Sequence, residues 1–121
     1  MTSVDHRRQP VLRQCAGMAA ATLSYPFGED TAVFKVGDKM FALVSLDDDP
    51  VSVTLKCEPA EAAALRDAHE AITPGYYMNK RHWITVDLGG TLPAGLVTDL
   101  VANSYELVVS SLPRKLRPAP A

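Results

Sequence analysis

The chain has little cysteine and no long apolar run, and each shortage excludes a class of protein. Cys15 and Cys57 are its two cysteines, and neither stands in a CxxC or Cys/His pattern. This spacing argues against a zinc site and favours a reducing compartment, although it leaves open a disulfide between the two. No stretch approaches the roughly 18 apolar residues of a membrane span, and residues 1–13 lack the apolar segment of a secretory signal. We therefore expect a cytoplasmic protein with no membrane partner.

Patterns that would indicate catalysis are also sparse. His6, His69 and His82 are the three histidines, and none has an identifiable nucleophile or orienting partner in the sequence. Gly89-Gly90 lacks the phosphate-loop pattern, and no spacing of ligand residues suits a metal ion. We expect no enzyme, no catalytic residue, no metal and no cofactor.

What the chain does have is the composition of one globular domain, with an uneven distribution of charge. Of its 121 residues, 47% are hydrophobic and 21% charged, with a net charge of −2, which argues mildly against a nucleic-acid binder. Residues 1–73 hold seven Lys/Arg and eleven Asp/Glu, a net charge of −4, whereas residues 74–121 hold five and three, a net charge of +2. Such polarity can steer an anion to one side, although it is common in proteins that bind none.

Apolar residues at helical spacing predict three helices. The first runs from Pro10 to Ala21, the second from Pro59 to Ile72, and the third from Pro93 to about Leu112. The apolar stripe of the third helix includes one serine: Leu96, Val97, Leu100, Val101, Ser104, Leu107 and Val108. Residues 1–9 and the basic, proline-rich residues 114–121 are expected to be flexible tails around a single domain at 10–113.

Period-2 alternation and turn residues predict five strands. They cover residues 32–36, 40–46, 51–56, a short extended piece at Tyr76 to Met78, and His82 to Leu88. Gly37-Asp38 suits a two-residue hairpin loop, which pairs Val36 with Lys39, Lys35 with Met40, and Phe34 with Phe41. The order of elements predicts a two-layer α+β fold, with the helices packed against one face of an antiparallel sheet.

Several blocks of the sequence resemble the MmcQ/YjbR family. The blocks are Tyr25-Pro26-Phe27-Gly28-Glu29-Asp30, Phe34-Lys35-Val36, Lys39-Met40-Phe41-Ala42-Leu43, Leu55-Lys56-Cys57, Thr73-Pro74-Gly75-Tyr76-Tyr77-Met78-Asn79-Lys80-Arg81-His82-Trp83, Ser104-Tyr105-Glu106-Leu107-Val108 and Ser111-Leu112-Pro113-Arg114-Lys115. The most specific is P-G-Y-x-M-N-K-x-H-W, and the similarity covers about residues 11–117. The departures lie at the start, where the first helix is Ala-rich and Ala-Thr-Leu-Ser replaces the usual residues before the Tyr-Pro-Phe-Gly turn.

The resemblance implies both a fold and a function. The fold is a two-layer α-β3-α-β2-α arrangement similar to secretion-chaperone domains, which is the order of elements predicted above. The function is non-catalytic DNA binding, and we expect the contacts to be made mainly with the phosphate backbone.

The candidate DNA-binding residues form two groups. Asn79, Lys80, Arg81 and His82 offer phosphate contacts, and Trp83 offers a stacking surface. If Ile84 and Val86 face the helices, alternation places Trp83 on the open face of the sheet, where Lys35 and Lys56 join it. The second group, Arg114, Lys115 and Arg117, follows the last helix and is placed to reach a phosphate backbone.

Each candidate also has a structural interpretation. Trp83 would pack in a small second core beside a solvated Lys80-Arg81 turn, and the C-terminal cations would complement the helix dipole. The loop from Tyr25 to Asp30 is expected to be structural, with Phe27 as its anchor. The rival function is protein or small-ligand binding, marked by a concave apolar patch around Met40, Trp83 and Tyr77 without surrounding positive charge.

Overall fold

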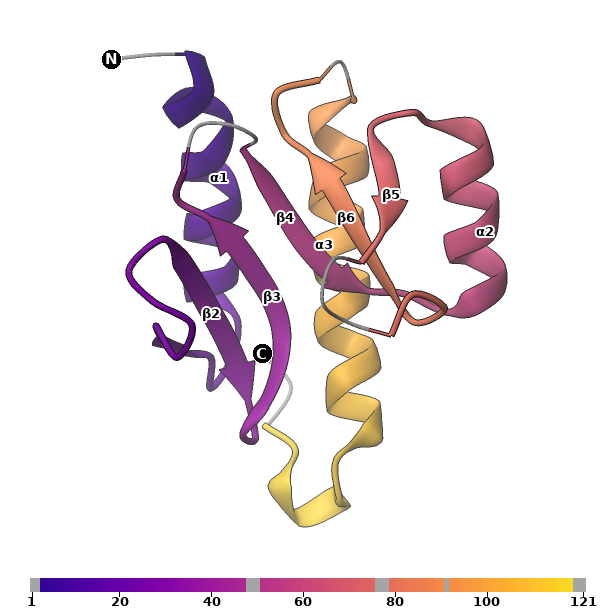
Figure 1. The fold of residues 1–121 in the computed structure, drawn as a ribbon. Helices are drawn as coiled ribbons and strands as arrows, with labels where there is room; N and C mark the ends of the chain where they lie inside the picture. The colour runs from indigo at the N-terminus through magenta and orange to yellow at the C-terminus, as the bar shows by residue number, and fades with distance from the viewer. Residues whose placement is uncertain (1–2, 48–50, 76–78, 91, 119–121) are drawn as a thin grey trace.

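The computed structural model describes residues 3–47, 51–75, 79–90 and 92–118, which form a two-layer α+β fold (Figure 1). The helices are α1 (Ser3–Gly17), α2 (Pro59–Ala68), α3 (Ala94–Ser111) and a 3₁₀ turn, η1 (Arg114–Leu116). The strands are β1 (Thr22–Ser24), β2 (Thr31–Val36), β3 (Lys39–Ser45), β4 (Ser52–Lys56), β5 (Ile72–Pro74) and β6 (Trp83–Asp87). Among the described helices, none combines the length and apolar character needed to cross a bilayer.

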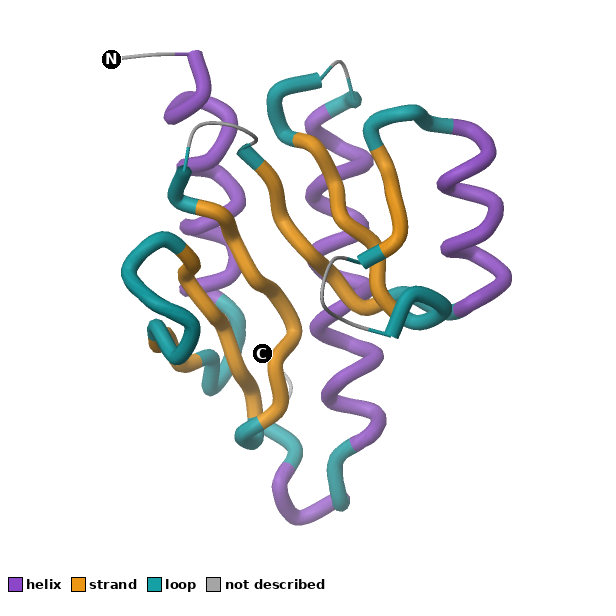
Figure 2. The backbone as a smooth tube through the Cα atoms, viewed as in Figure 1, coloured by secondary structure: helices purple, strands orange, loops and turns teal. Residues whose placement is uncertain are grey.

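The strands form one antiparallel sheet in the order β1-β2-β3-β4-β6-β5. Helices α1 and α3 cover one face, and α2 packs beside β5 at the sheet edge (Figures 1 and 2). The core lies between these layers, where Phe41 meets Tyr105 edge to face and packs against Phe34 at a tilt. The predicted α+β class with an antiparallel sheet is therefore confirmed.

Several stretches differ from the predicted elements, among them the first helix, which ends at Gly17 and not at Ala21. Strand β1 was not expected, because Leu23, its one apolar residue, is 49% exposed and gives no alternation towards a core. Helix α2 ends at Ala68, and Ile72 begins β5 instead of closing the helix. Ile72 is buried and pairs with Val86, a setting that suits a β-branched side chain. The extended piece predicted at Tyr76 to Met78 lies outside the described residues.

Helix α1 begins at Ser3, so residues 3–9 are its first turns and not a flexible tail. Arg7 Nη1 donates a hydrogen bond to Gly90 O at 2.6 Å, and Arg8 Nη2 donates one to Asp47 O at 2.9 Å. These contacts with distant loops hold the start of the helix against the domain. They help to offset the hydrogen bond that Pro10 removes, since it lies inside the helix and not in its first turn.

The C-terminal segment is also ordered further than predicted. Residues 114–116 form η1, and Arg117 turns back onto the end of α3. Its Nε donates to Leu112 O at 3.0 Å and its Nη2 donates to Ser110 O at 2.9 Å. Because the last carbonyls of a helix have no partner within it, Arg117 acts as a cap for α3.

The β2–β3 hairpin confirms two of its three predicted pairs. Gly37 and Asp38 have φ values of 56° and 66°, as a type I′ turn requires, and Lys35 pairs with Met40. Val36 likewise pairs with Lys39. The prediction that Phe34 pairs with Phe41 is wrong, because Phe34 lies opposite Ala42 and leaves Phe41 as the extra residue of a β-bulge.

Beside this bulge, β3 and β4 separate, and a side chain from α3 takes over their hydrogen bonding. The paired residues of these strands end at Ala42 and Leu55. Just beyond, the Ser104 hydroxyl donates to Phe41 O at 2.6 Å and accepts from the Lys56 N–H at 2.8 Å. Ser104 is fully buried. Its hydroxyl thus satisfies a carbonyl of β3 and an amide of β4 at the point where the strands part.

We predict that Ser104→Ala lowers the free energy of unfolding by about 1–3 kcal/mol, because it leaves two buried backbone groups without a partner. Ser110→Ala, at an exposed position of the same helix, is the control and should change the stability by no more than about 0.5 kcal/mol. Urea denaturation followed by circular dichroism measures both. Equal stabilities for the two variants would contradict the bridging role.

The two cysteines are free and buried, so the disulfide that the spacing left open is not formed. Burial raises the pKa of the Cys15 thiol to about 12. Burial and then the charge of Glu61, whose Oε1 lies 3.7 Å from Cys57 Sγ, raise the pKa of Cys57 to about 11. Both thiols are therefore protonated at neutral pH.

We predict that the native protein reacts slowly with an aromatic disulfide reagent at pH 8, because the thiolate is the reactive form and both thiols lie beneath other side chains. Unfolding in urea should release both thiols to react quickly. The measurement is the rate at which the aromatic thiolate leaves the reagent, followed by absorbance with and without urea. Rapid labelling of a thiol in the native protein would contradict this assignment.

Candidate nucleic-acid interface

The face of the sheet away from α1 and α3 carries most of the predicted site. Ile84 and Val86 of β6 are buried in the core between the sheet and the helices, so Trp83 and Thr85 point to the open face. One row of side chains crosses this face: Val33, Leu43, Thr54 and Thr85. The next row, nearer the β2–β3 turn, contains Lys35, Met40, Lys56 and Trp83.

A cavity of about 450 Å³ opens in the second row, which we call the sheet-face cavity. Its described lining residues are Pro26, Phe27, Lys35, Asp38, Lys39, Met40, Lys56, Trp83 and Val108. Val108 belongs to α3, so part of the floor is the helix beneath the separated strands. The cavity therefore lies beside the bulge and beside the strand separation that Ser104 bridges.

The described lining of this cavity is locally cationic although the chain is acidic. It contains three lysines, Lys35, Lys39 and Lys56, against one carboxylate, Asp38. Met40, Val108 and the aromatic Trp83 and Phe27 supply apolar surface between these charges. A concave apolar floor with a cationic rim suits a ligand that combines a flat apolar part with negative charge.

The loop before Trp83 presents its cations to solvent, as the structural interpretation expected. Asn79, Lys80, Arg81 and His82 are all exposed. The Asn79 Oδ1 accepts a hydrogen bond from the Arg81 backbone N–H at 2.9 Å, so this side chain shapes the turn and does not point away from it. Lys80 and Arg81 are left as exposed cations at the start of β6, next to the sheet-face cavity.

Trp83 is half-buried and lines the cavity. Its position is fixed by Gly75, whose N–H donates to Trp83 O at 2.8 Å. A Cβ at Gly75 would lie 2.5 Å from Trp83 Cβ and 3.0 Å from its carbonyl carbon. The backbone at residue 75 can approach Trp83 this closely only because glycine has no side chain.

The C-terminal cations differ in their contacts. All three are exposed, but Arg117 also donates hydrogen bonds to the end of α3, whereas Arg114 and Lys115 lie on η1. Leu112 packs against Gly37, and Lys39 Nζ lies 3.5 Å from Ser111 Oγ. The end of α3, and η1 after it, therefore lie near the β2–β3 turn (Figure 1).

Six described lining residues were not among the predicted DNA-binding residues: Pro26, Phe27, Asp38, Lys39, Met40 and Val108. Phe27 was expected to anchor its loop, but its side chain is 63% exposed and borders the cavity. Lys39 lines the cavity from the β2–β3 turn, and Val108 lines it from α3, where β3 and β4 separate. Exposure of an aromatic loop residue is a tertiary property, so the sequence held no signal for it.

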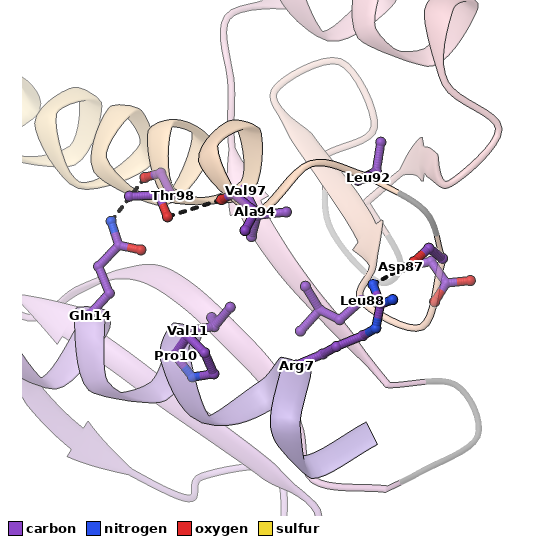
Figure 3. A pocket seen from close by; sticks show the side chains of 11 residues that line it. Arg7, Pro10, Val11, Gln14, Asp87, Leu88, Leu92, Ala94, Val97 and Thr98 are labelled. Carbon is purple, nitrogen blue, oxygen red and sulfur yellow. Dashed lines mark hydrogen bonds between the residues drawn. The ribbon is translucent and has the colours of Figure 1, made fainter. Parts of the chain in front are cut away.

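A second cavity, of about 390 Å³, lies between α1, the start of α3 and the loop that joins β6 to α3 (Figure 3). Its walls are largely apolar, with Pro10 and Val11 on one side and Val97 on the other. Gln14 Nε2 donates to Thr98 O at 2.9 Å and ties α1 to α3 across it, while Arg7 ties α1 to Gly90 in the loop. Within the described ranges, no three potential metal-binding side chains lie together.

Comparisons with known proteins place this chain. The model of the YjbR family matches residues 16–107. The chain belongs to the YjbR family. Among its relatives, Escherichia coli K12 YjbR is 35% identical over 107 residues, covering 88% of this chain and 91% of the relative. YbdF of Escherichia coli O157:H7 is 38% identical over 93 residues, 77% of this chain and 76% of the relative.

Solved structures of similar proteins share the fold. Deinococcus radiodurans protein DR2400 has a TM-score of 0.84 at 37% identity, over 89% of this chain and 83% of that one. A protein from Pseudomonas syringae has a TM-score of 0.71 at 30% identity, over 84% and 97%. The predicted membership of the family is confirmed.

We predict that Gly75→Ala displaces Trp83 and shifts the fluorescence emission of this single tryptophan, with a loss of stability of about 1–3 kcal/mol from the steric conflict. Gly95→Ala is the matched control, because nothing lies within 4 Å of its added Cβ and alanine favours the α3 helix. That variant should keep the emission spectrum and gain stability slightly. An unchanged spectrum in Gly75→Ala would contradict the close packing.

Proposed function

We propose that this protein is a non-catalytic DNA-binding protein whose open sheet face contacts mainly the phosphate backbone. The observation that carries the proposal is the cationic rim of the sheet-face cavity, formed by Lys35, Lys39 and Lys56. Lys80 and Arg81 extend the positive surface from the adjacent loop. Ammonium groups around an open groove are the arrangement by which proteins neutralise DNA phosphates.

Membership of the YjbR family establishes the fold and leaves the ligand to be argued from this surface. Free, buried thiols suit a reducing compartment such as the cytoplasm, where DNA is accessible to the protein. The rival function, binding of a protein or an uncharged small ligand, calls for a concave apolar patch without surrounding positive charge. Met40, Trp83 and Val108 provide apolar surface, but the lysines at the rim favour an anion.

We predict that the chain binds DNA at low salt and that Lys35→Gln and Lys56→Gln each weaken this binding. Each variant should reduce the slope of log affinity against log salt by about one unit, because one phosphate contact is lost. Glutamine keeps most of the aliphatic stem of lysine and removes only the charge. Fluorescence anisotropy with a labelled oligonucleotide over a salt series measures the slope.

Arg13→Gln is the control, because it removes one exposed cation from α1 on the opposite layer and should leave the slope unchanged. The double variant Lys80→Ala/Arg81→Ala tests the adjacent loop in the same assay. Absence of binding at low salt, or an equal effect of Arg13→Gln and the cavity variants, would contradict the proposed function.

A further inference from the structure

We infer that the DNA bound at this surface is a single strand, and that the sheet-face cavity receives one of its unstacked bases. This inference rests on the proposed function and goes beyond it by naming the form of the nucleic acid and the place of the base. It follows from three features of the cavity: its concave shape, its aromatic lining and the position of its lysines.

The concave shape of the cavity favours a free base over a duplex. Its lining runs from Met40 and Trp83 on the sheet to Val108 of α3, which is 1% exposed and forms the buried base of the hollow. A duplex keeps its bases stacked inside and presents only phosphates and groove edges, so filling this space would require flipping a base at a cost of a few kcal/mol. For an unpaired base this free-energy cost is much smaller, because no base pair has to be broken.

The aromatic side chains of the lining come from different parts of the chain. Trp83 lies on β6, held in place by Gly75, and Phe27 comes from the loop after β1. Phe27 is 63% exposed, so its ring is accessible to a flat ligand. Aromatic side chains along a positive groove are the platforms on which single-stranded nucleic acids stack their bases, largely independently of sequence.

The lysines are placed for the strand that carries such a base. Lys35 on β2 and Lys56 on β4 flank Met40 on β3, so they lie on either side of the opening. A phosphodiester backbone that crosses the rim would meet both ammonium groups while its base points towards Met40 and Val108. Exposed Lys80 and Arg81 are available to the next phosphates along the strand.

Three ligands test this inference with the intact chain at low salt: an oligo-dT, an abasic oligodeoxynucleotide of the same length and the matching duplex. Trp83 is the single tryptophan, so its fluorescence reports directly from the cavity wall. We expect oligo-dT to quench Trp83 and to bind at least about fivefold more tightly than the abasic strand, the gain expected from stacking one base. The duplex should bind more weakly than oligo-dT and leave the emission of Trp83 largely unchanged.

Phe27→Ala and Tyr25→Ala form a matched pair of variants. Both side chains are well exposed in the same loop, at 63% for Phe27 and 49% for Tyr25. Of the two, only Phe27 is among the described residues that line the cavity. Phe27→Ala should weaken oligo-dT binding about fivefold and leave abasic binding unchanged, whereas Tyr25→Ala should change neither. An equal loss in both variants would overturn base insertion.

The outcomes separate the inference from the proposed function. Equal affinity for oligo-dT and the abasic strand, or tighter binding of the duplex, would overturn base insertion and leave DNA binding in place. No binding of any of the three ligands would overturn both. An oligo-rU of the same length separates the two sources of a single strand, and its tighter binding would overturn DNA as the ligand.

Discussion

The arrangement of the open face depends on one buried hydroxyl. Ser104 of α3 bonds both to Phe41 O and to the Lys56 N–H, at the point where β3 and β4 stop pairing. Without it, two buried backbone groups would lack a partner, at a cost of about 1–3 kcal/mol. The strand separation, the bulge at Phe41 and the cavity between Lys35 and Lys56 therefore lie together around the Ser104 hydroxyl.

The sequence correctly predicted the features that short stretches of residues determine, such as strand alternation and the hairpin turn. Strand alternation placed Trp83 on the face of β6 away from the buried Ile84 and Val86, and Gly37-Asp38 predicted the hairpin turn. The bulge was missed because the Ser104 hydroxyl that meets Phe41 O comes from a helix 63 residues further along the chain. The start of α1 was missed for the same reason, since Arg7 bonds to Gly90 across 83 residues.

The fold arranges the predicted site residues only partly as the sequence suggested. Lys35, Lys56 and Trp83 meet as strand alternation indicated. Arg117, by contrast, is engaged as a helix cap, and the Asn79 side chain is engaged in its own turn. Sequence alone does not separate a free cation from one held by a carbonyl, because the distinction depends on which backbone groups the fold leaves without partners.

The shape of the open face is difficult to explain by stability alone. A continuous β3–β4 ladder would pair more backbone groups than the separated one. Because the chain carries a net charge of −2, it attracts phosphates poorly at distances beyond the screening length of about 10 Å. Under the proposed function, attraction arises at the rim itself, where three lysines face one aspartate among the described residues. The cavity brings together the positive charge and the apolar surface that the proposed nucleotide ligand would need.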